Sequence, residues 1–423
     1  MGKVIVSIKD LNVKFMSHGT VNSVIKNISL DIYENETLAI VGESGSGKSV
    51  LTRTFTNIIE RNGFITNGSI NYYGKMPNLI GAHDEQIDLT TYHYHLMDGI
   101  SRSKVIKLYK KEIKEINDLL LKDTINEDAA LLKEKIQQLQ QEMDKFINSK
   151  PSWFKPNLYA KDICKIRGGV IANIFQDPMT SLNPLLSVGQ QISWVLKLHQ
   201  GLSNEEAKAT ALKLLDKVGI INPEKAYKTK PIDFSGGMKQ RVVIAIALAA
   251  NPKILVADEP TTALDVTIQK QILKLITDLK NEFKFTIIFI THDLSVVANI
   301  ADRIAVMYCG QVIEYGTKDD IFTDPRHPYT WALLSSLPQL ASKNETLYML
   351  QGSPPSLSTA ITGDPFAPRN EYALAIDFKY DPPFFKVSDS HYAKTWLLDE
   401  RAKKINVPKK IVDLQNLIKK GIH

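Results

Sequence analysis

Two apolar patterns along the chain predict two kinds of strand. Residues 27–32 alternate apolar and polar side chains, and together with residues 3–9 they predict half-buried antiparallel strands. Residues 38–41, 253–258 and 286–291 are instead almost continuously apolar, which is typical of parallel strands covered on both faces. A segment of helical period separates the last two, so the pattern predicts an α/β domain with a parallel sheet.

Helical periodicity dominates two other stretches. Residues 187–250 are mostly of helical period, and Ser203 with Glu206 predicts a capping box at one helix start. The segment 77–166 has apolar residues at four- and three-residue spacing on both sides of a polar turn at 122–128, which predicts an inserted hairpin of two antiparallel helices. The apolar positions are Ile106, Tyr109, Ile113, Ile116 and Leu120 in the first helix, and Leu132, Ile136, Leu139, Met143 and Phe146 in the second.

The character of the chain changes after about residue 320. Two short strands are expected at 303–308 and 311–316; beyond them proline becomes frequent and periodicity weakens. We therefore expect a main domain over residues 1–320 and a smaller appended domain over residues 321–423. The lysine-rich last twenty or so residues predict a short basic helix.

Composition and charge say more about the cellular compartment of the protein than about its function. The chain has 423 residues and a net charge of +6, which fits an ordinary soluble surface or a face near anionic lipid or nucleic acid. Its two cysteines, Cys164 and Cys309, cannot form a disulfide framework and fit a reducing cytosol. Its first residues lack a long apolar stretch, so we expect no secretory signal, and no run of about 18 apolar residues predicts a membrane span.

The strongest chemical pattern is Gly-Glu-Ser-Gly-Ser-Gly-Lys-Ser at residues 42–49, between a predicted strand and a predicted helix. Glycines allow several backbone N–H groups to point at one place, and the N-terminus of a helix favours an anion. Lys48 is expected to reach the β- and γ-phosphates of a nucleotide, and Ser49 to bind Mg²⁺. The alternative is a glycine-rich turn with a chance lysine.

A second apolar strand ends in two carboxylates, Asp258 and Glu259. Asp258 is expected to hold the Mg²⁺ shell, and Glu259 to accept a proton from an attacking water. The alternative is a pair of idle, solvated acids. Gln176 and His292 also follow predicted strands, although a lone histidine there is more often structural than catalytic. Ser235 begins a Ser-Gly-Gly turn that opens a helix, a second N-terminus that would attract an anion.

Taken in their order along the chain, at 42–49, 174–178, 234–241, 254–260 and 289–293, the five segments resemble the ATP-binding cassette (ABC) family over most of residues 1–320. The resemblance implies an α/β fold: a P-loop NTPase cassette with a RecA-like core, an antiparallel β subdomain and a helical subdomain, here with the inserted hairpin and a C-terminal extension. It implies that Phe15 stacks on adenine and that His292 contacts the γ-phosphate. Gln176 would link Mg²⁺ and the attacking water to the helical subdomain.

The resemblance also implies a head-to-tail pair of cassettes with ATP between them. Residues 235–237 would contact ATP held by the opposite subunit, and Asp265 would lie at the dimer interface. ATP would close the pair and its hydrolysis would reopen it, moving a partner. The candidate catalytic residues are Lys48, Gln176, Glu259 and His292, and the candidate Mg²⁺ ligands are Ser49, Gln176 and Asp258. The candidate nucleotide contacts are Phe15, Gly42, Ser44, Gly45, Gly47, Lys48, Ser49, Val50, Gln176, Ser235, Gly236, Gly237 and Asp265.

Four longer stretches resemble the D-type ATPase subunit of oligopeptide and dipeptide importers. They lie at 176–192, where a permease coupling helix would dock, at 234–249 and 257–273, and at 326–338, where that family's C-terminal extension begins. The implied partners are a homologous F-type ATPase subunit, which usually carries glutamine where Met238 stands, two transmembrane permease subunits and an extracytoplasmic substrate-binding protein, with no nucleic acid. The implied location is the cytoplasmic face of the cell membrane, as a peripheral subunit.

Two features depart from that family. Its C-terminal extension often carries four cysteines that hold an iron–sulfur cluster, and the corresponding positions here are Asp364, Asn370, Asp377 and Thr395. Because oxygen and amide groups do not replace thiolates in such a cluster, we predict that none is bound. The hairpin within 77–166 is an insertion that this resemblance does not account for, and it is either a tolerated protrusion or a docking element for a permease, a substrate-binding protein or another partner.

Other functions remain as alternatives. A soluble ABC ATPase of the DNA-repair type would account for the basic charge and the hairpin, although its coiled coil normally follows the glutamine loop, whereas this insertion precedes Gln176. A cassette that binds ATP without cleaving it is disfavoured by Glu259 and His292. An importer of another small solute, such as nickel, would differ mainly in its permease and receptor, which are other chains.

Overall fold

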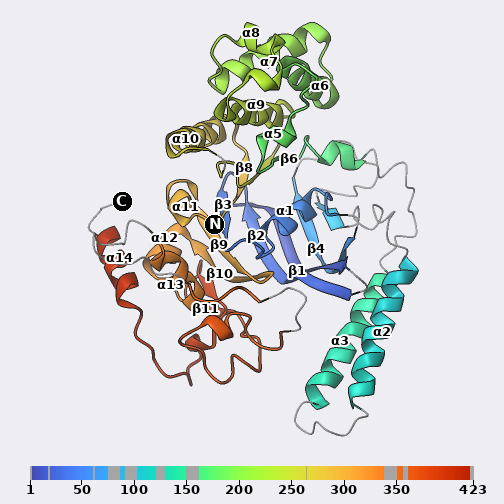
Figure 1. The fold of residues 1–423 in the computed structure, drawn as a ribbon, viewed down its shortest axis with the longest axis vertical. Coiled ribbons are helices and arrows are strands. Elements are labelled where there is room, and N and C mark those ends of the chain that lie inside the picture. The colour runs from blue at the N-terminus through green and yellow to red at the C-terminus, as the bar shows by residue number, and fades with distance from the viewer. Residues whose placement is uncertain are drawn as a thin grey trace.

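The computed structural model contains two β-sheets, a helical region beside the larger sheet, a long helical hairpin and a C-terminal segment that returns to the larger sheet (Figure 1). The residues that the structure describes are 2–17, 20–60, 62–74, 86–90, 102–120, 129–148, 162–262, 264–337, 350–355 and 361–419. No helix in these ranges is long and apolar enough to cross a membrane.

The smaller sheet is antiparallel, with the order β2-β1-β4-β5. Its strands are β1 (Val4–Ser17), β2 (Thr20–Tyr33), β4 (Gly63–Tyr73) and β5 (Gln86–Asp88). Ile28, Leu30 and Ile32 are buried, as the predicted alternation requires. The predicted strands over 3–9 and 27–32 are confirmed, but β1 and β2 are each 14 residues long because the register shifts between them let the pairing continue.

The larger sheet has eight strands in the order β11-β12-β10-β9-β3-β8-β7-β6. Its central strands β9, β3, β8, β7 and β6 are parallel, and every residue of β3, β7 and β8 is buried, as predicted from their apolar runs. These strands are β3 (Thr37–Val41), β6 (Ile171–Ile174), β7 (Ile254–Asp258), β8 (Thr286–Thr291), β9 (Arg303–Tyr308) and β10 (Gln311–Thr317). Helix α10 (Val266–Phe283) connects β7 to β8, and α11 (Leu294–Ile300) connects β8 to β9. Helix α1 (Lys48–Phe55) follows β3 and leads to β4 of the smaller sheet.

The predicted helical region lies beyond the β6 end of the larger sheet (Figure 1). It consists of α5 (Pro178–Ser181), α6 (Val188–Gln200), α7 (Asn204–Lys217), α8 (Pro223–Lys228), the 3₁₀ turn η2 (Pro231–Asp233) and α9 (Gly236–Ala249). The predicted capping box of Ser203 and Glu206 is present at the start of α7. Apolar side chains of these helices share one cluster with strands β6, β7 and β8, so the region is packed on the sheet rather than hinged away from it.

The predicted hairpin is formed by α2 (Arg102–Leu120) and α3 (Ala129–Asn148), which run side by side away from the antiparallel sheet (Figure 1). Tyr109, Ile116 and Leu139 are buried in its seam, together with Phe64 of β4. Lys14 of β1 forms an ion pair with Glu142 of α3 at 2.8 Å. The hairpin is therefore attached at its base to the sheet, while the turn predicted at 122–128 lies outside the described residues.

The segment after residue 320 completes the larger sheet. Strands β11 (Phe385–Lys386) and β12 (Tyr392–Ala393) pair next to β10, and helices α12 (Lys318–Thr323), α13 (Pro328–Ser335) and α14 (Lys409–Lys419) lie beside it. The 3₁₀ turns η4 (Ala367–Arg369) and η5 (Trp396–Leu398) complete the segment. The basic helix predicted at the C-terminus is confirmed by α14. The division into domains at residue 320 stays a prediction.

A buried carboxylate ties this segment to the sheet. Glu314 of β10 has no exposed surface, accepts hydrogen bonds from the backbone N–H groups of Arg326 and His327, and lies 2.8 Å from Nε2 of His391. An aromatic cluster adds to the junction: the ring of Tyr329 lies 4.6 Å from that of Tyr308 and 5.4 Å from that of Phe366. The C-terminal segment and the cassette thus share one apolar core, which also includes Ala39 and Val41 of β3.

Candidate functional site: a phosphate-binding loop at the carboxyl edge of the sheet

The sequence-predicted site residues meet where the parallel strands end. The loop at 42–47 follows β3, Asp258 closes β7, and His292 directly follows β8. Because β3, β8, β7 and β6 are neighbours and run in the same direction, their carboxyl ends form one edge. Gln176, two residues after β6, reaches the same edge.

The phosphate-binding loop leads directly into the N-terminus of α1. Gly47 caps this helix with a φ of 99°, a left-handed conformation that a residue with a Cβ atom would adopt only with strain. The ammonium of Lys48 is buried and donates hydrogen bonds to the backbone carbonyls of Gly42 and Glu43, both at 2.8 Å. Burial lowers the pKa of Lys48, whereas the nearby carboxylates of Glu259 and Asp258 oppose that shift. The two carbonyls are neutral acceptors, whereas the oxygens of a polyphosphate would give this ammonium a charged partner and stronger hydrogen bonds.

The hydroxyl of Ser49 and the carboxylate of Asp258 are suited to a magnesium ion. Ser49 Oγ donates a hydrogen bond to Asp258 Oδ1 at 3.0 Å. Burial raises the pKa of Asp258. A cation beside the carboxylate would reverse this shift, because it favours the ionised form. Magnesium prefers such oxygen ligands and usually takes only one or two from the protein, with phosphates and water supplying the rest. Across the described ranges no cluster of three or more His, Cys, Asp or Glu side chains could hold a metal by itself.

Glu259 is surrounded by polar groups of three different segments. Its carboxylate accepts hydrogen bonds from Gln176 Nε2 at 3.1 Å and from Thr262 Oγ1 at 3.0 Å, and Oε1 lies 3.2 Å from Nδ1 of His292. Its φ of 46° is unusual for a residue with a side chain. Strained backbone of this kind is concentrated at functional sites. A carboxylate held in this way can accept a proton from a water molecule placed beside it.

A cavity of about 440 Å³ lies over the loop. It is lined by the predicted residues Phe15, Ser44, Gly45, Gly47, Lys48, Ser49, Val50, Gln176 and Glu259, and also by Val24 and Glu60. Sequence reasoning missed Val24 and Glu60, because neither belongs to a recognisable pattern and only the fold of β2 and the chain after α1 brings them here. The lining combines apolar side chains with glycine backbone, as a site for a base and its phosphates requires.

The turn at 235–237 and Asp265 do not line this cavity. Ser235 and Gly236 are exposed at the start of α9, where Ser235 Oγ accepts a hydrogen bond from the N–H of Met238 at 3.4 Å. Asp265 is exposed and caps α10 by accepting hydrogen bonds from the N–H groups of Thr267 and Ile268. Within one chain the structure therefore does not bring these predicted residues to the phosphate-binding loop.

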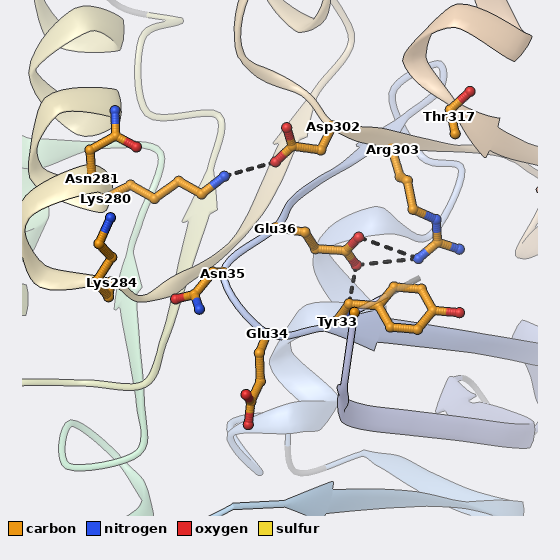
Figure 2. Close-up of a pocket in the computed structure, with 11 residues that line it drawn as sticks. Tyr33, Glu34, Asn35, Glu36, Lys280, Asn281, Lys284, Asp302, Arg303 and Thr317 are labelled. Atoms are coloured by element: carbon orange, nitrogen blue, oxygen red, sulfur yellow. Dashed lines mark hydrogen bonds and ion pairs between the residues drawn. The ribbon is translucent and has the colours of Figure 1, made fainter.

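A second cavity, of about 460 Å³, lies at the opposite end of the same strands (Figure 2). Its charged groups largely neutralise one another: Glu36 accepts hydrogen bonds from Arg303 and from the N–H of Tyr33, and Lys280 pairs with Asp302 at 2.8 Å. Ligands of open α/β sheets bind at the carboxyl ends of the strands, and this cavity lies at the amino ends. It therefore fits a structural ion-pair cluster better than a nucleotide site.

Two of the positions at which the sequence resemblance implies cluster-binding cysteines, Asp364 and Asp377, lie in hydrogen-bonded turns. Asp364 Oδ1 accepts from the N–H of Phe366 at 2.9 Å, and Asp377 Oδ2 accepts from the N–H of Leu374 at 2.6 Å. Burial raises the pKa of Asp364 to about 7 and also raises that of Asp377. The absence of an iron–sulfur cluster stays a prediction.

Comparison with known proteins assigns the chain to a family. Residues 25–262 match the ABC transporter family model, and residues 313–376 match the model of the oligopeptide/dipeptide transporter C-terminal region. The chain is 44% identical over 416 residues to the oligopeptide transport ATP-binding protein AmiE of Streptococcus pneumoniae, covering 98% of this chain and 96% of that protein.

Two further relatives are similar over nearly their whole length. The oligopeptide transport ATP-binding protein OppD of Bacillus subtilis is 44% identical, over 96% of this chain and 92% of that protein. The dipeptide transport ATP-binding protein DppD of Lactococcus lactis is 40% identical, over 95% of this chain and 93% of that protein. The chain therefore belongs to the ABC transporter family, among the ATP-binding proteins of oligopeptide and dipeptide transport.

Proposed function

We propose that this protein is the ATP-binding and ATP-hydrolysing subunit of an ABC importer that drives uptake of oligopeptides through separate membrane permease subunits. The observation that carries the proposal is the meeting of the loop at 42–49 with Asp258 and Glu259 at one edge of the sheet. The names of the relatives support peptides as the cargo. They give no support to the DNA-repair alternative or to nickel.

In this proposal the loop binds the phosphates, and residues at the carboxyl ends of the strands hold Mg²⁺ and transfer the proton. The loop N–H groups and Lys48 bind the β- and γ-phosphates, and Phe15 stacks on adenine. Ser49, Asp258 and Gln176 hold Mg²⁺, which when bound neutralises phosphate charge. Glu259 accepts the proton of the attacking water, and Gln176 and His292 hold its carboxylate in place.

We propose that two cassettes act together. The exposed turn at 235–237 would contact a nucleotide on the opposite subunit, with Asp265 at the interface. Shifting such a pair from about 1:99 to 99:1 closed requires about 5.5 kcal/mol of differential binding, which two polyphosphate sites can supply. The proposed partners are a homologous F-type ATPase subunit, two permease subunits and an extracytoplasmic substrate-binding protein, with the chain peripheral at the cytoplasmic face of the membrane.

The proposal is tested with Lys48→Ala in the complex of this chain with its permease subunits, reconstituted in vesicles. We expect ATP to bind at least about tenfold more weakly and ATP-dependent peptide uptake to stop, because the phosphates lose their buried cation. Lys280→Ala is the matched control, since Lys280 pairs with Asp302 in the second cavity. Unchanged uptake by the Lys48 variant would refute the proposal, as would wild-type vesicles that hydrolyse ATP without importing peptide.

A further inference from the structure

Arg369 of the C-terminal segment contacts the phosphate-binding loop at Glu43. Its Nη1 donates to Glu43 Oε2 at 2.7 Å and its Nη2 donates to Glu43 Oε1 at 2.9 Å. This is the bidentate pairing of a guanidinium with a carboxylate, which fixes both groups in direction as well as in distance. The two residues are 326 positions apart, so the contact depends on the complete fold.

Arg369 is itself held on several sides. Its side chain is only 5% exposed, Nε donates to the carbonyl of Gln351 at 2.9 Å, and Nη1 also lies 3.1 Å from the hydroxyl of Tyr308. A guanidinium fixed in this way loses little further freedom when it binds its carboxylate. An exposed ion pair contributes little to the stability of a protein. The Arg369–Glu43 pair differs, because its guanidinium is buried and is held by further hydrogen bonds.

The backbone of Glu43 is held as well. Its N–H donates to the hydroxyl of Tyr329 at 2.8 Å, and its carbonyl accepts from Lys48 Nζ at 2.8 Å. Tyr329 has no exposed surface and belongs to the C-terminal segment, like Arg369. Glu43 therefore connects two residues of that segment to the lysine that the proposed function assigns to phosphate binding.

We propose that Arg369 is a positioning residue for nucleotide binding: it neutralises the carboxylate of Glu43 and fixes the loop that receives the phosphates. The inference rests on the proposed function, because it concerns the same site. An unpaired carboxylate at the second position of a phosphate-binding loop repels a polyphosphate and also attracts Lys48 away from it. The C-terminal segment would thus make the cassette competent to bind nucleotide, in addition to any contact it makes with other proteins.

The test is a double-variant cycle in the full-length protein, with MgATP and MgADP as the ligands. We expect Arg369→Gln to weaken binding of both nucleotides roughly tenfold, and Arg369→Lys, which keeps the charge, to weaken it about threefold or less. Glu43→Gln is expected to bind at least as tightly as the wild type. Adding Glu43→Gln to Arg369→Gln is expected to restore most of the affinity, because no unpaired carboxylate remains.

A readout without nucleotide tests the positioning itself. Hydrogen exchange of residues 42–48 in the nucleotide-free protein is expected to be faster in Arg369→Gln than in the wild type. The control is Arg401→Gln, which removes an exposed bidentate pair with Asp399 in the same segment and should change neither measurement.

The outcomes separate this inference from the proposed function. Wild-type affinity in Arg369→Gln, or a loss that persists in the double variant, would overturn the role of Arg369 while Lys48→Ala still abolished binding. If Arg369→Gln does not fold, Glu43→Gln decides, since weaker nucleotide binding in that variant would overturn the inference. Failure of the wild-type protein to bind either nucleotide would instead overturn the proposed function.

Discussion

Glu259 shows how one side chain can be prepared for a proton transfer. Its carboxylate is 13% exposed and contacts Gln176, Thr262 and His292, which come from three separate segments. These neighbours restrict the carboxylate to a narrow range of positions before any substrate is present. Such restriction is favourable for catalysis, because the cost of orientation is met during folding rather than during the reaction.

Glu259→Gln is the direct test of this residue. The amide keeps the size of the carboxylate but cannot accept a proton, so we expect ATP hydrolysis by the reconstituted complex to fall by at least about 100-fold, while ATP stays bound and the closed pair of cassettes accumulates. Phosphate release and the amount of retained ATP are measured together. Glu282→Gln is the control, since Glu282 is exposed and pairs only with Lys217 among the described contacts. Hydrolysis at the wild-type rate would disprove the assignment.

Asp364 gives the protein a pH-dependent stability. Burial, with a smaller contribution from Asp377, raises its folded-state pKa to about 7. Because the folded protein then binds the proton more tightly than the unfolded chain, this group's stabilising contribution is complete below pH about 4 and is lost as the pH rises to about 7. Asp364→Asn cannot ionise, so we expect its free energy of unfolding relative to the wild type to increase between pH 5 and 8, by a few kcal/mol.

The measurement is denaturant unfolding at several pH values, comparing the wild type with Asp364→Asn. Burial lowers the pKa of His327 to about 3, which acts in the opposite direction, but His327 is present in both proteins and cancels in the comparison. Asp389→Asn, at an exposed site, serves as the control. A difference between wild type and variant that does not change with pH would contradict the prediction.

At the scale of elements, the hairpin of α2 and α3 is held by a small apolar cluster between its two helices and by contacts of that cluster with the antiparallel sheet. Leu139 is 5% exposed and packs in the cluster with Tyr109 and Ile116, whereas the nucleotide cavity is lined by other segments. The hairpin therefore shares a small apolar cluster with the antiparallel sheet, and because none of the residues in this cluster lines the nucleotide cavity, we expect the stability of the hairpin to be separable from that of the site.

Leu139→Ala tests this separation. Loss of a buried leucine costs roughly 2–5 kcal/mol, and here we expect the loss to appear as faster hydrogen exchange across 102–120 and 129–148, with nucleotide affinity unchanged. Glu115→Ala, an exposed change on the same hairpin, should alter neither property. A marked fall in nucleotide affinity would show that the hairpin acts on the site and is more than a tolerated protrusion.

The sequence predicted elements well where a local pattern determines them. The buried strands β3, β7 and β8 and the loop at 42–49 were evident because apolar runs and glycine spacing are local properties. The full length of β1 and β2 could not be predicted from the sequence, because it depends on pairing between the strands and on register shifts. The contact of Arg369 with Glu43 could not be predicted either, since no local pattern marks residues 326 positions apart.

At the scale of the whole molecule, the larger sheet joins the cassette and the C-terminal segment into one body. Strand β12 pairs with β10, and Tyr329, Phe366 and Ile411 belong to the same apolar cluster as Val41 of β3. Val41 immediately precedes the phosphate-binding loop. The fold of the C-terminal segment and the support of the nucleotide site therefore depend on the same set of contacts.

A variant that ends at residue 320 tests this dependence. It loses several large buried side chains, and burying each of these stabilises the fold by about 1.5–3 kcal/mol. Their sum is comparable to the free energy of unfolding of a typical domain, about 5–15 kcal/mol. We expect the truncated protein to aggregate on expression or to unfold at a much lower temperature than the full chain, as measured by size-exclusion chromatography and calorimetry. A soluble variant with unchanged unfolding temperature would show that residues 321–423 form an independent domain.

The aromatic cluster behind the loop has a practical consequence. Tyr329 lies against Tyr308 and Phe366, and its hydroxyl accepts a hydrogen bond from the N–H of Glu43. Any displacement of the loop changes the environment of a phenol group that is otherwise buried away from solvent. We therefore expect the near-ultraviolet circular dichroism of these tyrosines to change when nucleotide binds, which would allow occupancy of the cassette to be followed without attaching a dye.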